Sequence, residues 1–205
     1  MTNREDDAAQ EGDATMSAQP VGYDPPEPTT GEDLAELLDL IAHAPDDRYR
    51  YEILDGELVG NPPATWSHEN RVRRLQLAVL RVLPHGWAAY TNAGFIIGDE
   101  HVIPDLAVVD AELPDVEQQW GEAPLRLVVE VESVTTKHRD RKLKCELYAH
   151  RDIDAYWRIE RDGSTHVHTM PQVDGTWDEV RTVRPGETLP VSVPFEIELA
   201  PADWL

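Results

Sequence analysis

The spacing of apolar residues predicts three helices in this chain. In the first, apolar positions recur every three or four residues after Thr30, as on one face of an α-helix, at Leu34, Leu37, Leu38 and Ile41. The second helix is predicted from an N-cap at Ser67 to about Leu83, because its apolar residues show the same spacing. A third helix is expected at about 138–150.

Alternating or continuous apolar runs predict strands between and after the helices. Residues 48–59 predict a hairpin, since aromatic and polar residues alternate and Asp55-Gly56 supplies a turn. The run at 125–132 is almost continuously apolar, which is typical of a central strand covered on both faces. Other strands are expected at about 87–91, 93–98, 102–109, 155–159, 165–170, 176–183 and 194–199, with a loop over 110–124. The pattern predicts one mixed α/β (α+β) domain over 31–205, with a central mixed β-sheet flanked by helices.

Residues 1–30 are polar and acidic, without apolar periodicity, and predict a disordered N-terminal tail. This segment has seven acids against Arg4, so it carries −6 of the formal net charge of −22. The remaining −16 disfavours loose association with nucleic acid, whose backbone is itself negative. A nucleic-acid-binding function would therefore depend on a local basic surface and on a metal ion.

The composition indicates a cytoplasmic protein that does not enter a membrane. No apolar run approaches the roughly 18 residues that a membrane span requires, and the N-terminus lacks a secretion signal. The single cysteine is Cys145, which excludes an intrachain disulfide and a zinc site built on several thiolates.

Acidic and basic residues near the ends of two predicted strands suggest a metal-dependent reaction. Asp105 follows the run Val102-Ile103-Pro104, and Glu130 and Glu132 end the next apolar run, directly before a basic segment at 137–144. Carboxylates on neighbouring strands suit a hard divalent cation such as Mg²⁺, which polarises a phosphoryl oxygen and generates hydroxide. With a lysine near by to stabilise charge, the pattern predicts a site that cleaves phosphodiester bonds.

Six short motifs follow one another along residues 32–200. They are Tyr51-Glu52-Ile53-Leu54-Asp55-Gly56-Glu57-Leu58, Pro62-Pro63 with His68, Ile103-Pro104-Asp105, Val129-Glu130-Val131-Glu132-Ser133, the set Asp140, Lys144 and Tyr148, and Tyr156-Trp157. In this order they resemble the Uma-two family of bacterial restriction endonucleases, part of the PD-(D/E)XK nuclease superfamily. The resemblance implies a restriction-endonuclease-like core and hydrolysis of DNA with Mg²⁺, for which Mn²⁺ can substitute.

The resemblance also implies a role for each matching residue. Asp105 and Glu130 would be direct metal ligands, and Glu57 would be a third acidic residue at the metal. Lys144, on the third helix, would orient the hydroxide nucleophile and steady the scissile phosphate. Asp140 would support Lys144 from one helical turn earlier, although an acid four residues before a lysine is also an ordinary surface ion pair.

Several other residues leave alternatives open. Glu132 points to the same side of its strand as Glu130, so it either joins the metal ligands or accepts a hydrogen bond from a basic side chain. His68 either contacts substrate phosphate or has a solvated or capping role at the start of its helix. His166 and His168 alternate on a strand and are expected at the surface. The basic segment is either a solvated helix start or a DNA-binding surface formed by Lys137, Arg139, Arg141 and Lys142.

Two positions depart from the family pattern. Val134 stands where the family usually has proline, and Asp152 lies in a segment where it usually has glycine. Aspartate adopts the left-handed backbone conformation less readily than glycine but more readily than most residues. The changes fall in a loop and at a helix end, so they leave the expected ligands intact.

The sequence favours a metal-dependent endonuclease acting on duplex DNA, and many nucleases of this fold act as homodimers. The alternative is a non-catalytic binding or regulatory module that keeps the nuclease fold, which the strong acidity of the chain motivates. A decayed enzyme is expected to lack part of its catalytic set. The intact set therefore favours the enzyme, with Glu57, Asp105, Glu130 and Lys144 all present.

Overall fold

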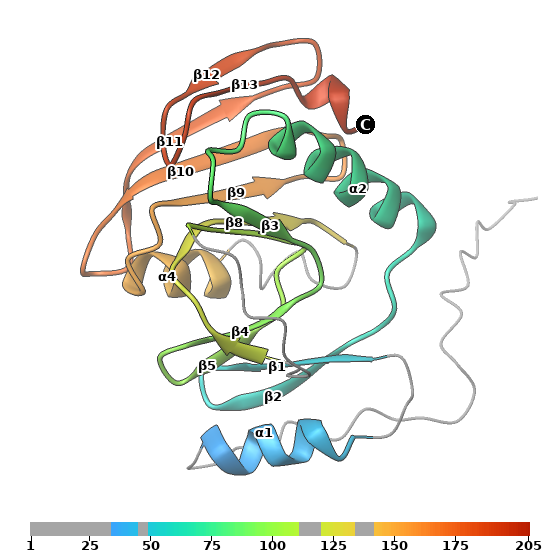
Figure 1. Ribbon diagram of the computed structural model, residues 1–205, viewed down its shortest axis with the longest axis vertical. Helices are drawn as coiled ribbons and strands as arrows, with labels where there is room; N and C mark the ends of the chain where they lie inside the picture. Colours follow the sequence, from blue (N-terminus) through green and yellow to red (C-terminus); the bar gives the residue numbers. More distant parts are fainter. Residues whose placement is uncertain (1–33, 45–48, 111–119, 134–141) are drawn as a thin grey trace, which may run out of the picture.

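The computed structural model describes residues 34–44, 49–110, 120–133 and 142–205 of the protein (Figure 1). The α-helices in these segments are α1 (Leu34–Ala42), α2 (Trp66–Leu80) and α4 (Leu143–His150), and a short 3₁₀ helix, η1 (Pro201–Asp203), lies near the C-terminus. None of the helices in the described segments is long and apolar enough to cross a membrane. The predicted tail at 1–30 lies outside the described residues.

A six-stranded mixed sheet forms the centre of the fold, in the strand order β11-β10-β9-β8-β6-β3. Within it β8 and β9 run parallel, and the other neighbouring strands are antiparallel. Its strands are β3 (Ala88–Tyr90), β6 (Leu106–Val109), β8 (Leu125–Val131), β9 (Ala155–Ile159), β10 (Thr165–Pro171) and β11 (Trp177–Val183). The side chains of β8 are nearly all buried, in agreement with its continuous apolar run.

A second sheet of five strands, in the order β2-β1-β5-β4-β7, lies below the central sheet in Figure 1, with α1 beneath it. Its strands are β1 (Arg50–Leu54), β2 (Glu57–Asn61), β4 (Gly94–Ile97), β5 (Glu100–Val102) and β7 (Trp120–Glu122). A separate two-stranded sheet pairs β12 (Leu189–Val191) with β13 (Ile197–Leu199).

Two apolar cores cover the two faces of the central sheet. On one face, Val72, Leu75 and Val79 of α2 pack against the sheet together with side chains of the C-terminal strands. On the other face, Tyr148 of α4 and Leu54 of β1 pack against the alternating side chains of the same central strands. The predicted mixed α+β architecture, with helices flanking a central mixed sheet, is confirmed.

The strand predicted at 102–109 is in fact two strands, β5 and β6, which belong to different sheets. The break falls at Pro104, which has no N–H to donate to a strand ladder. Because the chain changes sheets here, Asp105 lies at the junction of the two sheets rather than within a strand.

Two other boundaries also differ from the prediction. The N-cap of α2 is Thr65, whose Oγ1 accepts a hydrogen bond from the His68 N–H at 3.3 Å, so the predicted cap at Ser67 is wrong. Threonine is a somewhat weaker N-cap than serine, but its side chain can accept the same hydrogen bond from the first turn of the helix. The predicted loop at 110–124 contains β7, which pairs with β4.

Asp152, two residues after the end of α4, adopts the left-handed backbone conformation, with φ of 56°. The Asp152 N–H donates to the Ala149 carbonyl at 3.1 Å, and the Ile153 N–H donates to the Tyr148 carbonyl at 3.2 Å. These two bonds form the pattern that usually has glycine at the left-handed position. Asp152 thus occupies the conformation that glycine commonly adopts at a helix end.

Candidate active site

Asp105 and Glu130 lie side by side because β6 and β8 pair in the central sheet. The antiparallel register sets Leu106 opposite Val129, which places Asp105 beside Glu130 near the end of β8. Oδ2 of Asp105 accepts a hydrogen bond from the Val131 N–H at 2.8 Å, which anchors this carboxylate to β8. Both acids are buried, and the structure brings these two predicted metal ligands together.

The helix α4 supplies Lys144 and Tyr148, and both side chains reach Glu130. Nζ of Lys144 donates to Oε1 of Glu130 at 2.8 Å, and the Tyr148 hydroxyl donates to the same oxygen at 2.9 Å. Residues four apart lie on one face of a helix, which here packs on the central sheet. Burial and the negative charge of Glu130 raise the pKa of Tyr148 well above its usual value, so the hydroxyl keeps the proton that it donates.

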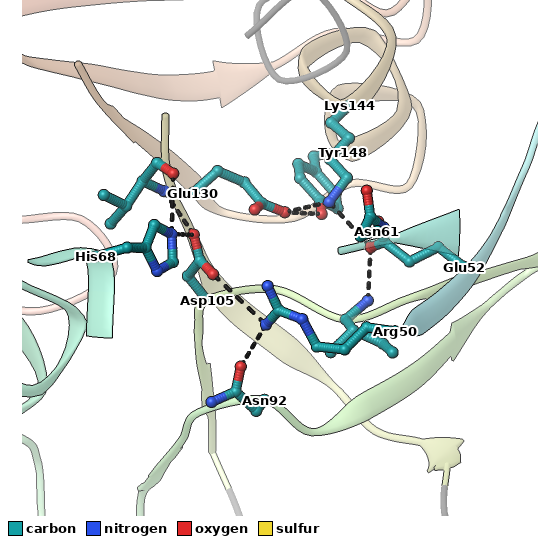
Figure 2. A network of polar contacts seen from close by, with 11 residues as sticks. Arg50, Glu52, Asn61, His68, Asn92, Asp105, Glu130, Lys144 and Tyr148 are labelled. Atoms are coloured by element: carbon teal, nitrogen blue, oxygen red, sulfur yellow. Dashed lines mark hydrogen bonds and ion pairs between the residues drawn. The ribbon is translucent and has the colours of Figure 1, made fainter. Parts of the chain in front are cut away.

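A third buried carboxylate, that of Glu52, comes from the other sheet (Figure 2). In β1, Tyr51 and Ile53 pack in the apolar cluster with α1. Successive side chains of a strand point to opposite faces, so Glu52 points away from α1 and toward Lys144. The alternation of side chains along β1 therefore turns Glu52 into the site.

The carboxylate of Glu52 is fully engaged. Its Oε1 accepts hydrogen bonds from Nζ of Lys144 at 2.9 Å and from the Ile103 N–H at 2.8 Å, while Oε2 accepts one from Nδ2 of Asn61 at 2.8 Å. Lys144 thus bridges Glu52 and Glu130, and one ammonium joins the two sheets.

Glu57 does not lie in this cluster, contrary to the expectation from the sequence. It begins β2 directly after the Asp55-Gly56 turn, opposite Leu54, and its side chain is exposed. Glu52, from the same sequence motif, stands in the cluster instead. The alternation of buried apolar residues in β1 is the signal that could have distinguished the two acids.

His68 and Arg50 flank Asp105 from two further elements. Nε2 of His68 lies 3.1 Å from Oδ2 of Asp105 and 3.2 Å from the carbonyl oxygen of Val131, while NH1 of Arg50 lies 3.8 Å from Oδ1. The His68 side chain is largely buried, so the solvated role is wrong. Its contact with Asp105 was not anticipated, because the two residues are far apart in the sequence.

The pairing of His68 with Asp105 shifts the pKa values of both groups. Burial alone would lower the pKa of His68, but the hydrogen bond to Asp105 and its negative charge outweigh burial and raise it. Burial alone would raise the pKa of Asp105, but the hydrogen bond and charge of His68, with the Val131 N–H, hold it below its usual value. The two groups therefore favour an ion pair.

The remaining predicted site residues lie outside the carboxylate cluster or outside the described residues. Glu132 accepts a hydrogen bond from NH1 of Arg158 at 2.7 Å, which is the second of its two expected roles. Lys142 is exposed immediately before α4. The other basic residues and Asp140 lie outside the described residues, and their roles stay predictions: Lys137, Arg139, Asp140 and Arg141.

The oxygen atoms around Asp105 fit a hard divalent cation. Oδ2 of Asp105 is engaged by His68 Nε2 and by the Val131 N–H, whereas Oδ1 lies 3.8 Å from NH1 of Arg50, beyond hydrogen-bond distance. Oδ1 is therefore the oxygen of Asp105 that suits a cation, together with the neighbouring carboxylate of Glu130. Mg²⁺ is usually bound through one or two carboxylates, with water and substrate phosphate as further ligands. Within the described segments, no three His, Cys, Asp or Glu side chains form a metal-binding group alone. Water or phosphate oxygens would have to complete the coordination.

Comparison with known proteins shows the family to which this chain belongs. The model of the Uma2 family, described as "putative restriction endonuclease", matches residues 34–202. The chain therefore belongs to the Uma2 family. The description of that family supports a nuclease function and thus a nucleic acid substrate.

The fold matches solved structures, one of which covers most of this chain. It is the crystal structure of "a putative nuclease belonging to DUF820" from Anabaena variabilis, which superposes with a TM-score of 0.63 at 19% sequence identity. The match covers 82% of this chain and 96% of that chain. A comparison with curated proteins gave no match.

Proposed function

We propose that this protein is a metal-dependent DNA endonuclease with its active site at Asp105, Glu130, Glu52 and Lys144. The proposal depends chiefly on the position of Lys144, because its ammonium lies between the buried carboxylates of Glu52 and Glu130. Glu130 in turn lies beside Asp105. Buried charges are costly, and apolar residues of similar volume would often stabilise a core as well or better. A charged cluster at the junction of two sheets is therefore a good candidate for a chemical role.

In this proposal Asp105 and Glu130 hold Mg²⁺, or Mn²⁺ in its place. When bound, the ion would polarise the scissile phosphoryl oxygen and generate hydroxide from water. His68 and the Val131 N–H hold Oδ2 of Asp105 in position. Glu57 was predicted to lie at the metal, but Glu52 is the acid of the hairpin that enters the cluster, and in this proposal it orients Lys144 rather than binding the metal.

Lys144 acts as a charged donor. Its position beside two carboxylates favours the ammonium form, which can orient the attacking water and offset negative charge on the phosphate. An ammonium has no lone pair, so Lys144 is not the general base in this mechanism. Helix α4 holds it rigidly, because Tyr148 and Lys144 contact the same oxygen of Glu130.

The proposed substrate is duplex DNA, bound with the help of the basic segment that includes Lys142, and the proposed assembly is a homodimer. The net charge of −22 makes non-specific attraction of DNA weak, so binding must come from local contacts and the metal. The same acidity favours a second candidate, a non-catalytic module with the nuclease fold.

Cleavage of supercoiled plasmid with Mg²⁺ or Mn²⁺ separates the two candidates. The endonuclease nicks the plasmid, and both EDTA and Asp105→Ala abolish nicking. A wild-type protein that binds Mn²⁺ and duplex DNA without any cleavage would instead support the non-catalytic module. Nicking that persists equally in Asp105→Ala would reject the assigned site.

A further inference from the structure

Arg50 lies at the edge of the carboxylate cluster, and it is engaged much more loosely than Lys144. Its side chain is 28% exposed, whereas that of Lys144 is 5% exposed. NH1 of Arg50 lies 3.8 Å from Oδ1 of Asp105, which is too far for a hydrogen bond. The guanidinium thus neutralises the carboxylate by proximity alone, and it keeps donors that a ligand can use.

The backbone and one neighbour aim Arg50 into the site. Arg50 begins β1, two residues before Glu52, so the two side chains leave the strand on the same face. NH1 also donates to Oδ1 of Asn92, in the turn between β3 and β4 (Figure 2). Asn92 has φ of 56°, a left-handed conformation that asparagine adopts more readily than most residues. The guanidinium is therefore held beside Asp105 while part of it stays open to solvent.

The charges of the cluster show why this position matters to a substrate. Glu52, Asp105 and Glu130 place three buried carboxylates where a negative phosphate must approach. Lys144 already donates to two of them. Arg50 is a partly exposed cation beside the third, and a planar guanidinium can donate two parallel hydrogen bonds to phosphate oxygens.

We propose that Arg50 binds a phosphodiester phosphate of the substrate next to Asp105, and that Asn92 is the positioning residue that orients it. The phosphate replaces a contact of 3.8 Å with charge-assisted hydrogen bonds, so little is lost when it arrives. The choice of a nucleic acid phosphate rests on the proposed nuclease function. The binding site itself rests on the geometry of Arg50.

The proposal is tested by following the Arg50 Nε–H signal in ¹⁵N-labelled full-length protein by nuclear magnetic resonance. The signal is assigned by its absence in Arg50→Gln. The probes are inorganic phosphate, a thymidine dinucleotide with one phosphodiester, and thymidine as the control without phosphate. We expect saturable shifts of this signal with both phosphates and none with thymidine. No saturable shift with the dinucleotide overturns the proposal, whether or not inorganic phosphate binds.

Matched variants show whether phosphate binding requires the planar guanidinium of Arg50 and its orientation by Asn92. Dinucleotide affinity, followed on backbone amide signals near the site, should fall about tenfold or more in Arg50→Gln. The affinity should fall less in Arg50→Lys, which keeps the positive charge but lacks the paired donors of the guanidinium. Asn92→Gly keeps a residue that tolerates the left-handed backbone and removes the amide, so we expect weaker binding with an unchanged fold. Arg184→Gln, an exposed arginine after β11, should bind as the wild type does. Equal affinity in Arg50→Gln and the wild type would reject a role for Arg50.

These measurements use neither DNA cleavage nor a bound metal, so they are independent of the nuclease assay. A protein that binds the dinucleotide through Arg50 but does not cut plasmid keeps this inference and loses the proposed catalysis. A protein that nicks plasmid equally well in Arg50→Gln, with no dinucleotide shift, keeps the nuclease and loses the inference.

Discussion

Nζ of Lys144 lies 2.8 Å from Oε1 of Glu130, although the lysine comes from helix α4 and the glutamate from the central strand β8. Both side chains are almost fully buried, and Glu52 from the second sheet completes the contact. One ammonium therefore neutralises two carboxylates supplied by different layers of the fold. This arrangement makes Lys144 both a structural and a chemical centre of the molecule.

Replacing Lys144 by methionine should destabilise the protein strongly. Methionine is an unbranched side chain one atom shorter than lysine, and it leaves Glu52 and Glu130 without their shared countercharge. Breaking a buried pair in this way costs about 3–5 kcal/mol. Urea unfolding followed by circular dichroism measures the change. Lys142→Met, two residues earlier and exposed, should change the free energy of unfolding by no more than about 0.5 kcal/mol. Equal stabilities of the two variants would contradict the buried network.

Glu52→Gln and Glu57→Gln form a matched pair that tests which acid of the hairpin belongs to the site. Glutamine at position 52 has only one acceptor oxygen and places an NH₂ group against donors from Lys144 or Asn61. We expect a loss of about 2–4 kcal/mol in stability, together with loss of any nuclease activity. Glu57 is exposed, so its substitution should be close to neutral in both assays. A larger effect of the substitution at position 57 than at position 52 would support the prediction from the sequence that Glu57 belongs to the site.

The contrast between Glu52 and Glu57 shows how far local sequence signals reach. Both acids belong to one motif, and only the packing of the hairpin against α1 turns Glu52 inward. Asp105 and Glu130 were easier to place, because they follow strong apolar runs that end at neighbouring points of one sheet. The pattern of β1 carried the missing information, since its apolar residues alternate with Glu52.

Other parts of the site depend on contacts that no local pattern encodes. His68 reaches Asp105 across 37 residues of sequence, and Arg50 reaches Asn92 across 42. The prediction of a single strand over 102–109 was wrong, because the apolar run continues through Pro104 although the chain passes there from one sheet to the other. His168 was expected at the surface but is buried between the aromatic rings of Tyr156 and Trp177.

The burial of His168 predicts a loss of stability in acid. Burial, with the nearby positive charge of Arg158, lowers the pKa of His168 from 6.5 to about 4. As the pH falls from about 6.5 to 4, the unfolded chain gains a proton that the folded chain does not accept. The contribution of His168 is therefore present above pH 6.5 and lost toward pH 4, by at most about 3 kcal/mol.

Unfolding measurements on wild type and His168→Phe between pH 4 and pH 7.5 isolate this contribution. Phenylalanine keeps an aromatic ring at the position and cannot titrate, so its stability should fall less steeply in acid. His68 acts in the opposite direction, because its raised pKa gives stability at low pH that is lost as the pH rises through that pKa. Parallel curves for the two proteins would show that His168 is not the buried neutral group described above.

Asp152→Gly should stabilise the end of α4. Asp152 adopts φ of 56°, where a Cβ atom costs about 1–2 kcal/mol and glycine has no such cost. The greater freedom of glycine in the unfolded chain offsets part of the gain, which leaves about 0.5 kcal/mol. Thermal unfolding should show a small rise in Tm. A fall in Tm would mean that the aspartate side chain stabilises this helix end.

The chemistry proposed for the protein depends on a divalent ion held by Asp105 and Glu130, so metal binding is its most direct test. Calorimetric titration of Mn²⁺ should show one site in the wild type that Asp105→Asn and Glu130→Gln each weaken by at least about tenfold, since each removes a charged ligand. Glu57→Gln should bind as the wild type does. Wild-type protein without Mn²⁺ binding, or with the same affinity in Asp105→Asn, would contradict a metal-dependent nuclease at this site.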